Sequence, residues 1–203
     1  MTDKDPREAV TSYITDMLAL EQHISKALEG QVQDLKAYPE LTGEIREVLG
    51  SIGGHIATLE MLAKARGGEG GGGAIKKIGS ALLGFGAAAI DMVRNEGMPK
   101  NLRDDYTAFS LATIGYVMLH TTAVSLGDRE VGDIAHRHLA DYARYVMTFN
   151  HLIPGATLRF LQEEGLPARQ DALAEISESI DSVWRDQAKS VPDATRMATG
   201  STR

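Results

Sequence analysis

Apolar residues recur every three or four positions through most of the chain, which is the period of an amphipathic helix. The first such stripe, with a capping residue before it, predicts a helix over residues 6–36. Pro39 starts a second helix, which we expect to end at Gly67. No alternating pattern of useful length predicts a strand, so the expected fold class is all-α.

The later part of the chain continues the helical pattern after a glycine-rich crossover. This crossover covers residues 67–101 and carries a predicted short helix within 74–93. Four further helices are predicted, over 102–126, 129–152, 154–164 and 167–189. We expect Pro154 to interrupt the chain after 129–152. The last two of these helices are the C-terminal helices, within 154–190. We expect one helical-bundle domain over 1–190, with a four-helix core in 6–152 and a flexible tail over 191–203.

Composition narrows the classes of function. The 203 residues include 21 Lys and Arg against 28 Asp and Glu, which gives a formal net charge of -7. An acidic chain with no basic run argues against a nucleic-acid partner. Cysteine is absent, which excludes thiolate catalysis and cysteine-ligated metals. The first residues contain no apolar run typical of a signal peptide, so we expect a cytoplasmic protein.

Two polar residues interrupt apolar stripes. Glu21 lies on the apolar face of the first helix, and His55 lies between apolar positions of the second. A buried carboxylate is costly unless it is paired, protonated or bound to a metal. Each residue lies about 16 or 17 positions from the turn between the two helices, so an antiparallel pair brings them to the same level. We expect contact between them, either as a buried hydrogen-bonded pair or as ligands of a metal ion.

Other polar side chains are candidates for the same interior. Tyr142 and Tyr145 lie in the fourth long helix and Tyr116 in the third, where their hydroxyls are predicted to reach Glu21 or His55. His120 follows Tyr116 by one helical turn and is either an interior ligand or a core histidine. The candidate pocket residues are Glu21, His55, Tyr116, His120, Tyr142 and Tyr145, and the candidate metal ligands are Glu21 and His55.

The helix order and several short stretches resemble a known family. Residues 20–28, LEQHISKAL, are similar to its Ala-Glu-x-x-Leu-x-Lys-Ala-Leu, and residues 54–60, GHIATLE, to its Gly-Gln-x-x-x-Leu-Glu. Tyr116 and residues 126–131 are similar to the corner between its third and fourth helices. Over about residues 6–150 the chain resembles the bacterial stress-associated YciF/YciE-type ferritin-like family. The resemblance implies an antiparallel ferritin-like four-helix bundle with a long crossover.

The resemblance also implies a changed metal site. Family members are expected to hold two metal ions, and only Glu21 carries over from their ligands. Other ligand positions fall on Gly50, Ser51, Gly53, Phe109, Ala112, Tyr142 and Tyr145. The interior is then mostly apolar, and we expect space for a small-molecule pocket beside Gly50, Gly53, Gly54, Ala112 and Gly115.

These observations give three functional expectations. The first is a non-catalytic bundle that binds a small molecule or a flat cofactor, such as a tetrapyrrole, in its interior. The second is a metal-binding stress-response protein with oxidase-like chemistry, using Glu21 and His55. The third is assembly, since residues 102–126 and 74–93 offer apolar surface for a homodimer or higher homo-oligomer and, less readily, for a membrane face.

Overall fold

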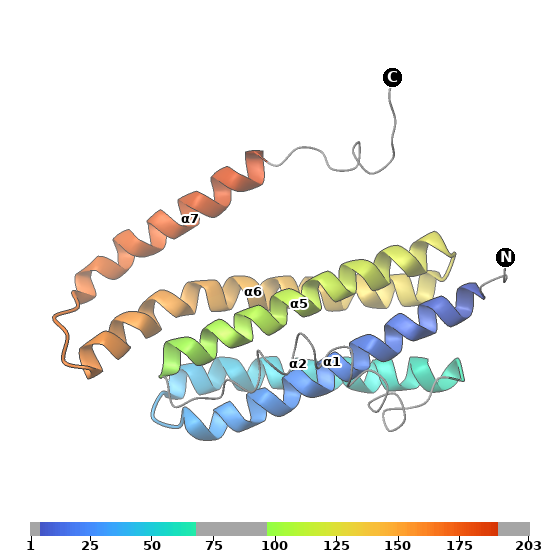
Figure 1. Ribbon diagram of the computed structural model, residues 1–203, viewed down its shortest axis with the longest axis horizontal. Helices are drawn as coiled ribbons and strands as arrows, with labels where there is room; N and C mark the ends of the chain where they lie inside the picture. Colours follow the sequence, from blue (N-terminus) through green and yellow to red (C-terminus); the bar gives the residue numbers. More distant parts are fainter. Residues whose placement is uncertain (1–4, 68–96, 191–203) are drawn as a thin grey trace. The chain divides into compact units, whose positions relative to one another are not determined.

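The computed structural model describes residues 5–67 and 97–190, and over these residues every regular element is helical (Figure 1). The all-α prediction is thus confirmed for this part of the chain. The helix expected within 74–93 and the tail over 191–203 lie outside the described residues. The elements are α1 (Pro6–Asp34), α2 (Pro39–Ala65), α5 (Met98–Ser125), α6 (Arg129–Glu163), the short 3-10 helix η2 (Gln170–Ala172) and α7 (Leu173–Ser190).

Local sequence explains where the helices begin and turn. The side chain of Asp5 accepts a hydrogen bond from the backbone N–H of Arg7 at 2.9 Å and so caps α1. Gly127 has a φ of 82°, a conformation that L side chains rarely adopt, and it lets the chain reverse between α5 and α6. The next residue, Asp128, accepts a hydrogen bond from the Val131 N–H at 3.2 Å.

Three predicted helix boundaries are wrong. Pro154 does not end α6, which continues to Glu163, because a proline inside a long helix removes one backbone hydrogen bond without abolishing the rest. Helix α5 begins at Met98 rather than at residue 102, since Pro99 fits the first helical turn. Helix α7 begins at Leu173 rather than at residue 167, because η2 comes before it.

The chain divides into two compact units, one ending at Ile153 and the other beginning at Pro154. In the first unit α1 packs against both α2 and α5. The Arg7 guanidinium near the start of α1 donates to the carbonyl of Ala65 at the end of α2, at 3.3 Å, so these two helices are antiparallel. Aromatic rings from α5 and α6 fill much of the core, namely Phe109, Tyr116, Tyr142 and Phe149, all fully buried.

The outward face of α5 is apolar. Its exposed large hydrophobic residues are Leu111, Ile114, Val117, Met118 and Val124. No Asp, Glu, Lys or Arg occurs between Tyr106 and Gly127. In the described part of the chain, α5 is the one helix long and apolar enough to cross a membrane by length and composition. Its other face carries buried Phe109 and Tyr116, as expected for a core helix of a bundle.

Candidate functional site

The site is centred on Glu21, whose side chain is completely buried on the inner face of α1. Both carboxylate oxygens are occupied. Oε1 accepts a hydrogen bond from the Tyr116 hydroxyl and lies 3.2 Å from His55 Nδ1. Oε2 accepts a hydrogen bond from the Tyr142 hydroxyl at 2.7 Å. Four helices therefore meet at one carboxylate, and its burial is offset by three polar partners.

His55 connects this carboxylate to the rim of the bundle. Its second ring nitrogen, Nε2, lies 3.2 Å from Oδ2 of Asp141, whose side chain is about one-third exposed. Burial opposes a charged ring and lowers the pKa of His55, but the hydrogen bonds and charges of Glu21 and Asp141 outweigh it and leave the pKa raised. With a carboxylate at each nitrogen, the geometry favours the imidazolium form, which donates from both N–H groups.

A second imidazole, His138, stacks on His55 with ring centroids 3.8 Å apart. Its Nδ1 lies 3.0 Å from the Tyr116 oxygen, and because that hydroxyl donates to Glu21, Nδ1–H is the donor. Burial, and next the charge of His55, lower the pKa of His138 to about 3. His138 is therefore neutral, and its Nε2 carries a lone pair.

The two tyrosines act as fixed donors. Burial, and next the negative charge of Glu21, raise the pKa of Tyr116 and of Tyr142 far above the ordinary phenol value. Both therefore stay protonated and orient the Glu21 carboxylate. A carboxylate held in one orientation is suited to receive a cation with little reorganisation.

Three of these side chains lie close enough together to be candidate ligands of a single metal ion. Glu21, His55 and His138 each offer one ligand atom, and these atoms lie within 4.8 Å of one another. Ligand atoms sharing one ion lie roughly 3–3.5 Å apart, and the lone pair of an imidazole lies in the plane of its ring. Shared coordination therefore requires the stacked rings of His55 and His138 to turn out of their parallel arrangement. Two imidazoles and one carboxylate suit zinc, iron or manganese. Two ions do not fit, because the described residues around Glu21 supply no further buried carboxylate.

The structure brings together four of the six predicted pocket residues: Glu21, His55, Tyr116 and Tyr142. Tyr145 is buried beside Tyr142, with ring centroids 5.4 Å apart, but is not among the donors to Glu21. His120 was expected in the interior and lies elsewhere, because its Nδ1 bonds the backbone oxygen of Gly132 near the α5–α6 turn, at 2.8 Å.

Sequence reasoning missed two members of the network. His138 lies one helical turn before Tyr142 and shares its inner face, which is a signal that could have identified it. Asp141 lies beside the apolar stripe of α6, and its side chain reaches His55 from the rim. A residue at the edge of a stripe is not marked by hydrophobic periodicity, so no sequence signal indicated Asp141.

The expectation of interior space is wrong at each of the four glycines. Gly50, Gly53 and Gly54 are exposed on the outer side of α2, and a Cβ added at any of them would meet no atom within 4 Å. At Gly115 the space is taken, since a Cβ there would lie 2.5 Å from the sulfur of Met17. The three exposed glycines lie on the face of α2 that is turned away from Glu21. Their positions in the sequence had predicted that they line the interior.

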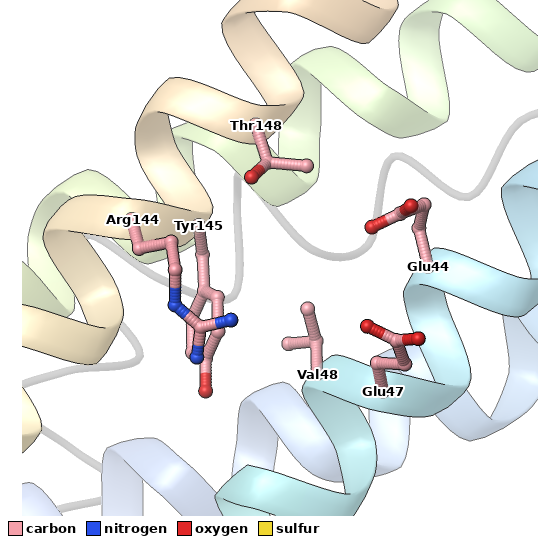
Figure 2. Close-up of a pocket in the computed structure, with 6 residues that line it drawn as sticks. All are labelled: Glu44, Glu47, Val48, Arg144, Tyr145 and Thr148. Carbon is pink, nitrogen blue, oxygen red and sulfur yellow. The ribbon is translucent and has the colours of Figure 1, made fainter.

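A small cavity lies between α2 and α6 on the side of Tyr145. Figure 2 shows Glu44 and Glu47 of α2 across from Arg144 of α6, with the Tyr145 ring beneath the guanidinium. The cavity volume is about 30 Å³, which is room for a few water molecules at most. It is too small for a flat organic cofactor.

A second polar pair, Gln31 and Asp105, lies outside the Glu21 network. The Gln31 amide of α1 donates to Oδ1 of Asp105 in α5 at 2.7 Å. Asp105 is 4% exposed, and burial raises the pKa of its carboxyl to about 8. The other oxygens of the pair, Gln31 Oε1 and Asp105 Oδ2, are buried without a partner. A proton on Oδ2 would make that oxygen a donor, beside a partner side chain that has an unpaired acceptor.

Comparison with known proteins identifies a family. A family model with the description "Domain of unknown function (DUF892)" matches residues 5–162. No curated protein and no solved structure matches the chain. The matched residues contain α1, α2, α5 and nearly all of α6, and therefore every residue of the Glu21 network.

Proposed function

The chain belongs to the DUF892 family of the ferritin-like superfamily, and from this premise we propose that its bundle binds one metal ion through Glu21, His55 and His138. The observation that carries the proposal is the meeting of three buried candidate ligands, drawn from three helices, at a single level of the bundle. We further propose that the chain is close to the YciF/YciE-type stress-associated branch of the superfamily.

Each residue of the network has a defined task in this proposal. Tyr116 and Tyr142 hold the Glu21 carboxylate, and Asp141 holds the second nitrogen of His55. His55 releases the proton that faces Glu21 when it becomes a ligand, because a metal needs the nitrogen lone pair. A bound zinc ion would supply Lewis acidity, and iron or manganese would add redox chemistry.

Binding of a small molecule in the interior is the weaker proposal. A small molecule would need an empty cavity beside Glu21. Buried aromatic side chains and Met17 fill the places where the sequence predicted that cavity. Polar groups that already satisfy one another also give a guest few unmade hydrogen bonds. A metal ion needs much less volume than an organic guest, and it would take the place of the proton between His55 and Glu21.

The test is titration of Zn²⁺ or anaerobic Fe²⁺ into chelator-treated protein, followed by calorimetry. We expect one equivalent of bound metal to depend on His138, and thus to disappear or to bind at least about tenfold more weakly in His138→Ala. His23→Ala is the matched control, because His23 is an exposed histidine of α1. Circular dichroism establishes that the variant is folded. Equal binding by wild type and His138→Ala would overturn the proposal.

We propose self-association through α5 as a second function of the bundle. The observation in its favour is the exposed apolar face of α5, which lacks charged residues along most of its length. Apolar patches of this kind are frequent at subunit contacts. A second copy presents the same uncharged face, so that two chains meet without unpaired charges.

Mass measurement in solution tests the self-association. Ile114 is 58% exposed on this face, and Ile114→Glu is expected to convert an oligomer into a monomer by burying an unpaired charge at the contact. Ala140→Glu places the same charge on an exposed position of α6 and is expected to leave the mass unchanged. A wild-type protein that is monomeric at high micromolar concentration rejects this proposal.

A further inference from the structure

We propose a second, surface metal site formed by His120 of α5 and His136 of α6. The two imidazole rings lie with their centroids 5.6 Å apart and their planes at 51°. His120 is half-buried and His136 is exposed, so the site opens to solvent. It is separate from the Glu21 network, because neither ring belongs to the hydrogen bonds of that network.

The approach of the two helices depends on a glycine. A Cβ added to Gly132 of α6 would lie 2.9 Å from a side-chain carbon of Val124 in α5, a distance that real Cβ atoms do not show. Glycine therefore allows α5 and α6 to come together near their connecting turn. His136 lies one helical turn beyond Gly132 on the same face, so this approach also brings its ring beside His120.

A backbone hydrogen bond prepares His120 to act as a ligand. Its Nδ1 lies 2.8 Å from the carbonyl oxygen of Gly132, and a carbonyl only accepts, so Nδ1 carries the proton. The lone pair of a neutral ring is then on Nε2. Metal-binding histidines commonly have this arrangement, in which one nitrogen donates to a carbonyl while the other coordinates the ion.

The separation of the rings fits a shared ion. A metal lies about 2 Å from a ligating ring nitrogen, and thus about 3 Å from the centroid of that ring. Two rings that share an ion therefore have centroids no more than about 6 Å apart. The observed 5.6 Å lies within this limit, so rotation of the exposed His136 side chain can direct a ring nitrogen toward His120. Imidazole pairs favour Zn²⁺, Cu²⁺ and Ni²⁺, with water completing the coordination.

The experiment is calorimetric titration of Zn²⁺ into full-length protein that carries no histidine tag. His136→Ala is the first variant, because an exposed side chain can be removed without disturbing the core. We expect it to lose one equivalent of Zn²⁺ or to bind that equivalent at least about tenfold more weakly. His120→Ala should give the same loss, and His23→Ala should bind as wild type does.

Competing sites are separated by comparing variants. An equivalent lost in His136→Ala and kept in His138→Ala belongs to the surface pair, whereas the reverse pattern belongs to the interior site. The proposal is overturned if wild type and His136→Ala bind the same number of ions with the same affinity. It is also overturned if wild type binds no Zn²⁺, or if every bound equivalent depends on His138.

Discussion

Replacement of Asp105 by asparagine is expected to stabilise the protein at neutral and alkaline pH. In the native state Asp105 faces Gln31 with one unpaired oxygen on each side chain, and the pKa of the carboxyl is raised to about 8. An asparagine amide can donate to Gln31 Oε1 while its oxygen accepts from Gln31 Nε2. The variant therefore offers at every pH the donor that the wild-type acid offers only when protonated.

The sign of the pH dependence follows from proton binding. In the unfolded chain the Asp105 carboxyl ionises near the ordinary aspartate pKa of 3.8, whereas the folded carboxyl keeps its proton until about pH 8. Between these values the native state binds more protons, so the free energy of unfolding falls by up to about 1.4 kcal/mol per pH unit as pH rises. Asp105→Asn removes this loss, so its advantage grows from pH 4 to pH 8 and then levels off.

Urea denaturation followed by circular dichroism at pH 5, 6.5 and 8 measures this effect. At pH 8 the difference from wild type is expected to be on the order of 3 kcal/mol or more. The control is Asp133→Asn, which removes an exposed carboxylate of α6 and should change stability by roughly 0.5 kcal/mol or less. A pH-independent difference between Asp105→Asn and wild type would show that the wild-type carboxyl is not protonated.

Glu21→Ala is expected to destabilise the metal-free protein by about 3–5 kcal/mol. The substitution removes the acceptor of three buried donors, Tyr116, Tyr142 and His55, and each unpaired buried donor has a desolvation cost. The helices still carry their apolar stripes, so we expect a folded protein with a lower midpoint of denaturation. Glu29→Ala, at an exposed position of the same helix, is the matched control and should be nearly neutral.

The pH profile distinguishes this network from simple cavity formation. The raised pKa of His55 contributes stability that is fully present below its unfolded pKa of about 6.5 and is lost as pH rises through the folded pKa. Glu21→Ala should therefore cost more at pH 5.5 than at pH 9. NMR titration of the His55 ring should show a lower pKa in the variant. An unchanged His55 pKa would contradict the pairing.

Much of the fold and part of the site could be predicted from helical period and rise. Glu21 and His55 interrupt apolar stripes at equal distances from one turn, and the structure places them in contact. This prediction depends only on the geometry of an antiparallel helix pair. Tyr116 and Tyr142 followed because they lie on the inner faces of the other two helices.

The remaining site residues depend on details that periodicity does not contain. His120 and Tyr116 are one turn apart in sequence, yet the crossing of α5 with α6 directs His120 to the Gly132 carbonyl. Burial of Asp105 was not predicted because its polar partner, Gln31, comes from a distant part of α1. Such contacts depend on how each helix is rotated about its own axis relative to its neighbour. That rotation is set by side-chain packing across the whole core.

The donors to Glu21 have a consequence for the order of folding. They lie 34, 95 and 121 residues from it along the chain, in α2, α5 and α6. A pair of helices formed early, such as α1 with α2, can supply only the nearest donor, and burial of the carboxylate would then remain unfavourable. Contacts between distant residues form slowly because long loops must close. We therefore expect dehydration of Glu21 to be among the last steps of folding, completed only when the fourth helix has docked.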